Sequence, residues 1–524
     1  MVSMQTLLSS NRERIESLID QHGIDTAWRS LLLARIGTAG RNFNYILAAD
    51  ELRGIKSAPI DILQHLSIGE ISVLYEYSLA YNNRANRKSE GQYFTPDDVA
   101  RFLTKHARDF PDSTVWVDPC SGVGNLSYWL VREQKNQEQF LLNKLYLADS
   151  DPLALLIARI LFTLAFQKNE IGLFGKLQER FLSCDFLTAN DLPKFDAAIL
   201  NPPYVSGVCN EAFKTAGTKN TYAYFLERVA KLCDAGYISI TPQTFTNATS
   251  FVSLREVLLA GHKAIDVYCF DNVPDNIFSG VKFGSGNTNR ANSTRAGVII
   301  AKKSQRQTHR ITPLLRWRSH ERDQMLALAH NFLTETRFTK LLFPKVSREL
   351  QPLYDIVKTF DTLGQLVVDG PTGHRLQVPT TPRYFISANK RPVSRTSFKT
   401  LYFASEQDLN RAYIILNSSY MYWWWRVCDG GMTISEKTLL DLPIPRIDPL
   451  TTRQFVLKLE QSERTSKVIK MNAGKAIENI KHSPDLIHSL TAFLFPTYAT
   501  DLGATHANSH LQIHKSSPQL RMSF

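Results

Sequence analysis

The sequence predicts an α/β fold built on a mostly parallel sheet, with a helical region before it and a mixed α+β domain after it. From Thr114 to Lys302, short β-branched runs alternate with helical runs. Strands that alternate with helices form parallel sheets covered on both faces. At 524 residues the chain is too long for one ordinary core, so we expect two or three domains.

The helical region is expected over residues 1–90, because apolar residues recur at helical spacing in "LLSSNRERIESLI" and "IGEISVLYEYSLA". Strand patterns rich in β-branched and aromatic residues follow at 114–118, 144–149, 195–201, 236–241, 264–270 and 296–301. Helical patterns separate the first of these strands, at 125–134, 151–166 and 221–236.

The regular pattern ends at about Lys302. Short apolar runs, many arginines and turn-prone pieces such as "VDGPTGHRL" follow, and they indicate a separate domain. We therefore expect domains at 1–90, 91–302 and 303–500, with a Ser- and His-rich flexible tail at 501–524.

Composition excludes several classes of protein. Apolar residues make up 43% and charged residues 21%, as in water-soluble globular proteins. The longest apolar helical run, 153–166, is too short to cross a bilayer, and the chain start lacks a continuous apolar segment, so a cytoplasmic protein is expected, with no membrane partner. The six cysteines form no CxxC pair, which predicts reduced thiols and no metal site.

The positive charge is concentrated in one part of the chain. Residues 281–410 hold 21 Lys and Arg against 9 Asp and Glu, which accounts for the whole net charge of +12. Phosphate contacts need clustered cations, so this concentration favours a surface for a polyanion. A merely solvated basic face is the alternative.

The end of the first strand carries a glycine loop, with Asp118, Gly122 and Gly124 in "VDPCSGVGNL". Two glycines let the backbone pass close to a ligand and leave amide groups free before the next helix. A plain tight turn explains the same residues about as well, because the full G-x-G-x-x-G pattern is absent.

Acidic residues end the next two strands. Asp149 could accept two hydrogen bonds from a ribose diol, whereas Asp151 before Pro152 is expected to cap a helix. Asp185 could accept from an adenine amino group, with Phe186 covering the ring. Each of these strand ends could be an ordinary turn. Together with Asp118, however, Asp149 and Asp185 make three acidic strand ends in register along one sheet, and these outline a nucleoside-shaped pocket.

The fourth strand ends in "NPPY", Asn201 to Tyr204. The prolines Pro202 and Pro203 hold the carbonyls of Asn201 and Pro202 in one orientation. Asn201 offers an amide oxygen and Tyr204 a ring face, which together suit an exocyclic amino group on a planar ring. A stiff strand-to-loop turn is the alternative.

At these residues the sequence resembles the adenine-N6 DNA methyltransferases that depend on S-adenosylmethionine and place their cofactor motifs before a target-recognition domain. The resemblance runs from about Ile68 to Lys302 and includes the lead-in "LYEYSLA". The segments that carry it are "GQYFTP" (91–96), "VDPCSGVGNL" (117–126), "LADSD" (147–151), "CDFL" (184–187) and "ILNPPY" (199–204). "LNSSYMYWWW" and "LPIP" (442–445) resemble, more loosely, recognition domains of restriction-modification systems.

The resemblance implies a Rossmann-like methyltransferase domain with a mostly parallel seven-stranded sheet, S-adenosylmethionine as cofactor and a C-terminal target-recognition domain. The cofactor residues that it implies are Tyr93, Phe94, Thr95, Asp118, Gly122, Gly124, Asp149, Asp185 and Phe186. The catalytic residues that it implies are Asn201, Pro202, Pro203 and Tyr204.

The implied reaction begins with an adenine that is flipped out of duplex DNA and stacked on Tyr204. The amide of Asn201 and the carbonyl of Pro202 then accept from N6, whose lone pair attacks the methyl group. A second aromatic should hold the base from the other side, with Phe278 as the candidate and Phe283 as its competitor. The candidates for DNA contacts are Arg383, Lys390, Arg391 and Arg395.

The expected partners are duplex DNA and a separately encoded restriction endonuclease. Methyltransferases that act on RNA or on a protein glutamine share "NPPY", but the basic C-terminal domain and "GQYFTP" favour DNA. A bifunctional enzyme that also cuts DNA would need a nuclease domain, and the first 90 residues are too short and too helical for one. An inactive DNA-binding module is disfavoured by the intact "NPPY".

Overall fold

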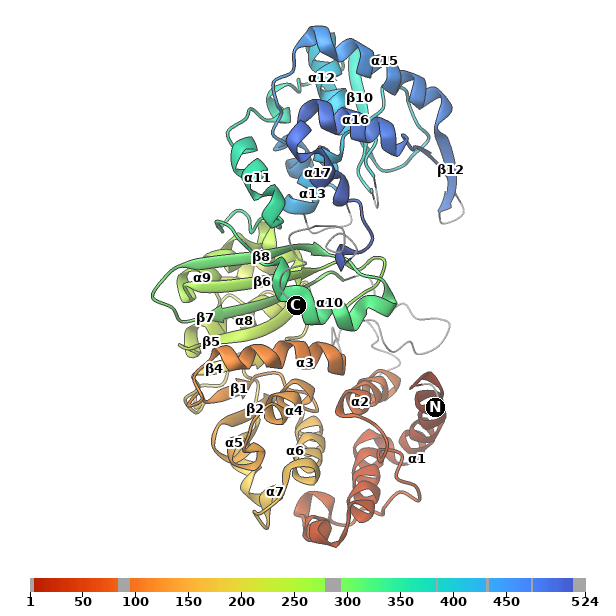
Figure 1. The fold of residues 1–524 in the computed structure, drawn as a ribbon. Coiled ribbons are helices and arrows are strands. Elements are labelled where there is room, and N and C mark those ends of the chain that lie inside the picture. Colours follow the sequence, from red (N-terminus) through yellow and green to blue (C-terminus); the bar gives the residue numbers. More distant parts are fainter. Residues whose placement is uncertain are drawn as a thin grey trace. The chain divides into compact units, whose positions relative to one another are not determined.

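The computed structural model describes residues 4–82, 95–278, 294–382, 385–429, 433–472 and 475–511. By their internal contacts the residues group into two compact units (Figure 1). The first unit comprises 1–243, 250–267 and 275–308, and the second comprises 244–249, 268–274 and 309–524.

The strands of the main sheet lie in the order β3-β2-β1-β4-β5-β7-β6-β8-β9. They are β1 (Trp116–Asp118), β2 (Leu145–Asp149), β3 (Phe181–Ser183), β4 (Ala197–Leu200), β5 (Gly236–Pro242), β6 (Ala264–Phe270), β7 (Ala296–Lys302), β8 (Thr308–Leu315) and β9 (Thr334–Glu335). The strands β3, β2, β1, β4 and β5 pair in parallel, and β7 pairs antiparallel with β5. The predicted α/β class with a mostly parallel sheet is thereby confirmed.

The predicted number of seven strands is wrong, because β8 and β9 extend the sheet to nine. The pattern of β8 is interrupted by Pro313, a residue that cannot donate to a strand ladder and weakens the strand signal. β9 is only two residues long, which is too short for any periodic pattern to indicate it.

The order of the parallel strands reverses beside β1, which pairs with β2 on one side and with β4 on the other. Right-handed crossovers therefore place the helices that follow β1 and β2 on one face and those that follow β4 and β5 on the other. Figure 1 shows α4, α5 and α6 beside β1 and β2, and α8 and α9 beside β5 and β7. In sheets of this kind a ligand binds at the reversal point, outside the carboxyl ends of the strands.

The helices of the first unit are α1 (Met4–Ala39), α2 (Ile68–Asn82), α3 (Asp97–Lys105), α4 (Asn125–Arg132), α5 (Gln137–Asn143), α6 (Pro152–Phe166), α7 (Leu173–Lys176), α8 (Thr221–Leu232) and α9 (Val252–Gly261). The helix α6 is apolar except for Arg159 and Thr163 and is largely buried, as expected for a helix between two layers. One hydrophobic core joins Leu156 and Ile160 of α6 to Trp28 of α1 and Tyr75 of α2.

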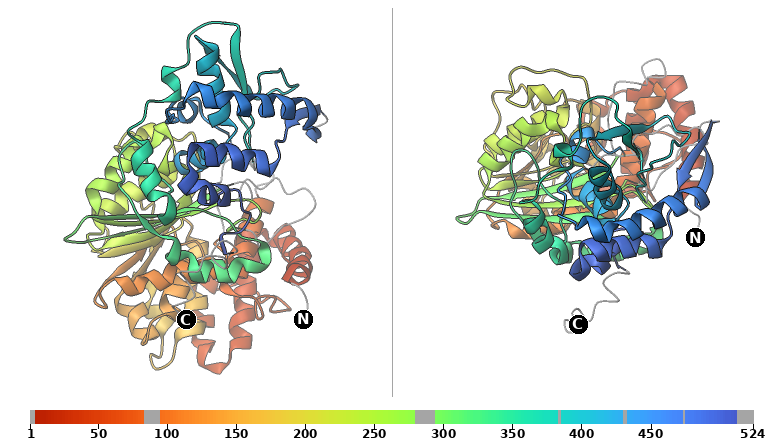
Figure 2. Two further views of the ribbon diagram at one scale, coloured as in Figure 1. Left: turned by 45° about the horizontal axis from the view of Figure 1, so that its top comes forward. Right: turned by 90° about the horizontal axis from the view of Figure 1, so that it is seen from above.

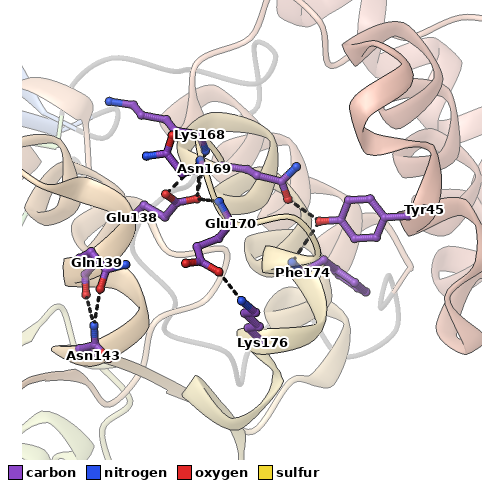
Figure 3. A network of polar contacts seen from close by, with 10 residues as sticks. Tyr45, Glu138, Gln139, Asn143, Lys168, Asn169, Glu170, Phe174 and Lys176 are labelled. Carbon is purple, nitrogen blue, oxygen red and sulfur yellow. Dashed lines mark hydrogen bonds and ion pairs between the residues drawn. The ribbon is translucent and has the colours of Figure 1, made fainter.

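Hydrogen bonds also hold the segment that follows α6 (Figure 3). The Glu138 carboxylate of α5 accepts from the backbone N–H groups of Lys168, Asn169 and Glu170, at 2.9–3.3 Å. The hydroxyl of Tyr45 accepts from the Phe174 N–H at 3.2 Å. The end of α6 is thus tied both to α5 and to the N-terminal region.

The second unit contains eight described helices and two small antiparallel sheets. The helices are α10 (Arg322–Leu328), α11 (Gln351–Val357), α12 (Glu406–Leu416), α13 (Ser419–Cys428), α14 (Glu436–Leu440), α15 (Pro449–Thr465), α16 (Pro484–Leu494) and α17 (Ala499–Ala504). The small sheets pair β10 (His374–Pro379) with β11 (Phe398–Phe403) and β12 (Lys467–Asn472) with β13 (Lys475–Ile480). The strands β12 and β13 form the blue ribbon beyond α15 in Figure 2.

The tryptophan-rich helix α13 forms the centre of this unit's core. Trp423, Trp424 and Trp425 are all buried. The hydroxyl of Tyr420 donates to the carbonyl of Pro443 at 2.9 Å, so the "LPIP" segment packs against α13. The expected tail begins within α17, and residues 512–524 lie outside the described residues.

None of the described helices is both long enough and apolar enough to cross a membrane. The apolar 153–166 run, predicted to be helical, lies within α6.

A buried ion network ties the end of β8 to α13 within the second unit. The carboxylate of Asp271 is 1% exposed and pairs with Arg316 Nε at 2.8 Å and with the guanidinium of Arg426. Arg316 also donates to the hydroxyl of Tyr422 at 2.7 Å. One carboxylate therefore compensates two buried guanidinium groups.

We expect Asp271→Asn to lower the free energy of unfolding by about 3–5 kcal/mol, because two buried cations would lose their counter-charge. The matched control is Asp355→Asn, whose pair with Lys358 is roughly half exposed and should contribute about 0–1 kcal/mol. Chemical denaturation of both variants measures the difference. Equal losses would contradict the assigned importance of the network.

Candidate active site

A pocket lies at the carboxyl ends of β1, β2 and β4, where the strand order reverses. Its empty space, which includes open solvent, amounts to about 1020 Å³. Its lining includes Thr95, Asp118, Gly122, Asn125, Asp149, Asp151, Asp185, Phe186, Asn201 and Pro203. The strand ends that the sequence singled out are therefore brought together.

The two glycines after β1 serve different purposes. Gly124 has φ +86°, and a Cβ there would lie 2.9 Å from the ring of Phe162 and 3.1 Å from Leu147. Gly122 has φ +51°, but a Cβ there would meet open space. Gly124 thus permits close packing on α6, whereas Gly122 leaves space open beside the loop.

The Asp149 carboxylate at the end of β2 is held by backbone amides. It accepts from the Gly122 N–H at 2.8 Å and from the Asp151 N–H at 2.9 Å. Burial raises the pKa of Asp149 above its ordinary value. These bonds orient the carboxylate and, since each oxygen has two lone pairs, leave acceptor capacity for a ligand.

The Asp118 carboxylate at the end of β1 is 1% exposed. It accepts from the hydroxyl of Ser127 in α4 at 2.9 Å. Burial, together with the nearby charge of Asp149, raises the pKa of Asp118 to about 7. A cationic ligand in the pocket would favour the charged form of both acids.

Asp151 caps α6, as predicted. Its carboxylate accepts from the N–H groups of Leu153 at 3.0 Å and Ala154 at 3.3 Å. The hydroxyl of Tyr75 in α2 donates to the other carboxylate oxygen. Asp151 therefore joins the start of α6 to the N-terminal helices.

The third acidic strand end holds its own turn. Asp185 accepts from the Leu187 N–H at 3.0 Å and from the Thr188 hydroxyl at 2.9 Å. Phe186 is 2% exposed and stacks on Phe225, with ring centroids 6.3 Å apart. Both residues line the pocket, and their contact with an adenine ring remains a prediction.

The amide of Asn201, directly after β4, has a fixed orientation. Its Nδ2 donates to Thr95 Oγ1 at 2.9 Å, and the carbonyl of Thr95 in turn accepts from Asn125 Nδ2 at 2.6 Å. The amide oxygen of Asn201 is therefore turned away from Thr95. It accepts from the hydroxyl of Tyr204 at 2.7 Å.

The ring of Tyr204 is half-buried among aromatic side chains. It lies 6.2 Å from Phe278 at an interplanar angle of 64°, and 6.3 Å from Tyr222 at 80°. The carbonyl of Ile240 lies 3.1 Å from the Tyr204 hydroxyl. Because a hydroxyl carries one proton, Tyr204 can donate to Asn201 or to Ile240 but not fully to both.

Other predicted site residues lie elsewhere. Tyr93, Phe94, Phe283 and Arg383 are outside the described residues. In the second unit, Lys390 bonds to Glu460 and Asn410 at 2.7 and 2.8 Å, and Arg395 bonds to Thr381 and Asn479. Arg391 is exposed.

Sequence reasoning missed one wall of the pocket, which α2 supplies through Ser72, Tyr75, Glu76 and Leu79. These positions have i, i+3, i+4, i+7 spacing and so share one face of a helix. That spacing is readable from "SVLYEYSLA", but the sequence alone does not tell which face of the helix meets the pocket. The hydrogen bond between Asn201 and Thr95 joins residues 106 positions apart, and no pattern of neighbouring residues in the sequence predicts such a contact.

The pocket chemistry fits S-adenosylmethionine, which joins an adenosine to a methionine that carries a sulfonium and an ammonium group. Five carboxyl groups line it, from Glu76, Asp118, Asp149, Asp151 and Asp185, and none of the described lining residues is Lys, Arg or His. The strand order, the reversal point and these strand ends define a methyltransferase domain of the S-adenosylmethionine-dependent, Rossmann-like class.

A family model described as N-6 DNA Methylase matches residues 67–281. The match confirms, for this part of the chain, the predicted resemblance to adenine-N6 DNA methyltransferases and its cofactor. A Type II methyltransferase, M.VspI of Vibrio sp. (strain 343), is 28% identical over 202 residues, which are 36% of this chain and 45% of that protein. The chain thus matches less than half of that relative's length.

Two solved structures are similar at low sequence identity. A type I restriction-modification methyltransferase subunit from Streptococcus thermophilus has a TM-score of 0.37 and 16% identity, covering 63% of this chain and 75% of that one. The type IIG restriction endonuclease BpuSI has a TM-score of 0.40 and 12% identity, covering 96% and 76%. The fold assignment rests on the strand order of the chain itself.

We expect Gly124→Ala to destabilise the protein more than Gly122→Ala. Both substitutions place a side chain at positive φ, but only the first also overpacks against Phe162, at a further cost of about 1–3 kcal/mol. Thermal or denaturant unfolding of the two variants measures the difference. Equal losses would show that Phe162 and Leu147 yield without cost.

Proposed function

We propose that the protein is a site-specific DNA methyltransferase that transfers a methyl group from S-adenosylmethionine to N6 of a flipped-out adenine, as the modification enzyme of a restriction-modification system. The observation that carries the proposal is the Asn201 amide, which Thr95 orients beside a pocket lined by acidic side chains. The family match and the name of the relative M.VspI support it.

In this mechanism the chain orients the base and contributes no nucleophile. The Asn201 amide oxygen and the Pro202 carbonyl accept from the two N6 protons, which concentrates the nitrogen lone pair toward the incoming methyl group. Pro203 helps to keep the carbonyls fixed because its φ is locked. When bound, S-adenosylmethionine supplies the electrophilic methyl group.

Tyr204 has two roles in the proposal. Its ring and Phe278 stack on the two sides of the flipped adenine. Its hydroxyl holds the Asn201 oxygen before substrate arrives and then turns to the Ile240 carbonyl, which frees an Asn201 lone pair for N6. The active-site acceptor is thereby kept hydrogen-bonded in both states.

We propose that residues 303–500 form a DNA target-recognition domain, which recognises the base sequence of the DNA. The local excess of cations over 281–410 supports phosphate contacts there. Of the candidates, the exposed Arg391 is the one best suited to DNA, while Lys390 and Arg395 hold neighbouring segments. We further propose a cytoplasmic enzyme with a separately encoded endonuclease as partner.

The direct test incubates the protein with S-adenosylmethionine labelled in its methyl group and with plasmid DNA, followed by digestion to nucleosides. The label is expected in N6-methyladenosine of a defined sequence context. Label in cytosine, in RNA or in a protein fraction would overturn the proposal.

Asn201→Ala is expected to lower the rate of methyl transfer by about 100-fold or more, because the oriented acceptor for N6 is lost. Cofactor binding should persist, since the acidic wall is untouched. The control Asn82→Ala, at the exposed end of α2, should retain full activity. Single-turnover methylation and calorimetry measure the two effects, and near-normal transfer by Asn201→Ala would show the assignment to be wrong.

Tyr204→Phe and Tyr204→Ala separate the two roles of Tyr204. The Phe variant keeps the stacking face and loses only the hydroxyl, so a small effect is expected. The Ala variant loses stacking worth about 1–3 kcal/mol and should weaken base capture accordingly. Fluorescence of 2-aminopurine at the target position reports base flipping, and equal behaviour of the variants would refute a stacking role.

A further inference from the structure

The helix α2 is a fixed wall of the cofactor pocket. Before its first turn, the Ser67 hydroxyl bonds to Asp97 at 2.6 Å, and Trp129 Nε1 of α4 donates to the same carboxylate at 2.9 Å. On the other flank, Tyr75 is bonded to Asp151 at the start of α6. α2 is thus anchored to α3, α4 and α6, so the side chains on its pocket face have defined positions.

Glu76 is the lining acid for which neither carboxylate oxygen has a hydrogen-bond partner among the described residues. Asp149 is bonded to two backbone amides, Asp151 to the start of α6 and Asp185 to its own turn. Asp118 Oδ2 accepts from Ser127, while the buried Oδ1 of Asp118 has no hydrogen-bond partner among the described residues. Glu76 has no ion-pair or hydrogen-bond partner among the described residues, yet its side chain faces the pocket. Burial raises the pKa of Glu76 to about 8, so an isolated carboxylate is costly there.

The order of the strands places Glu76 relative to the ligand. Along the pocket edge the strands run β3, β2, β1 and β4, which carry Asp185, Asp149, Asp118 and Asn201 at their ends. The proposed function puts the adenosine at β3 and β2 and the transferred methyl group at β4. The amino-acid end then lies near β1 and α4, the helix on which α2 is anchored through Asp97 and Trp129.

We infer that Glu76 binds the ammonium group at the amino-acid end of S-adenosylmethionine, so that the N-terminal helical region is part of the cofactor site. The inference rests on the proposed function. A half-buried carboxylate that faces the pocket without a partner is complementary to an ammonium group, which donates up to three charge-assisted hydrogen bonds.

The test compares two ligands by calorimetry on the full chain. S-adenosylmethionine carries the ammonium group, whereas methylthioadenosine has the same nucleoside, a neutral thioether in place of the sulfonium and no amino-acid end. Glu76→Gln is expected to weaken S-adenosylmethionine binding by about 10- to 100-fold and methylthioadenosine binding by less than about twofold. The matched control is Glu13→Gln, the same change at an exposed position of α1, which should alter neither affinity.

A second variant guards against a folding artefact. Glu76→Asp keeps the charge on a shorter side chain, so it should lose less affinity for S-adenosylmethionine than Glu76→Gln does. Equal losses for both ligands, equal losses in both variants, or unchanged binding by Glu76→Gln would overturn the inference. Failure of the unaltered protein to bind either ligand would instead count against the proposed function.

Discussion

The hydrogen bond from Asn201 to Thr95 is the constraint on which the arrangement of the site depends. It joins the end of β4 to Thr95, two residues before α3, and the carbonyl of Thr95 extends the link to Asn125 at the start of α4. A primary amide can be turned either way at little intrinsic cost, so its direction must be imposed by neighbours. Here the donor side is occupied by Thr95, which leaves the acceptor side for Tyr204 and, in the proposed reaction, for the substrate.

The carboxylates around the pocket illustrate how one residue type acquires different uses from its surroundings. Asp151 and Asp185 satisfy backbone donors of a helix start and of a turn, and they would be needed there whether or not a ligand bound. Asp149 both orders the glycine loop and keeps spare acceptor capacity. Glu76 has no such local role, which is why the inference about ligand binding falls on it.

Much of the fold was readable from the sequence, because alternating strands and helices have distinct periodicities and each of the first four strands is followed or ended by a polar residue. The placement of Asn201, Asp118 and Asp149 at one sheet edge followed from parallel pairing alone. The wall formed by α2 was not readable, since helical spacing identifies a face without identifying what it meets. The extension of the sheet by β8 and β9 was hidden by a proline and by the brevity of the last strand.

The hydrophobic core shared by α1, α2 and α6 bears on where the methyltransferase domain can be cut. A fragment that began at Gly91, the start of the first cofactor motif, would present the apolar side of α6 to water. Exposed apolar surface of that kind promotes aggregation rather than a smaller functional enzyme. Proteolysis or recombination that spares this domain should therefore keep the first two helices attached to it.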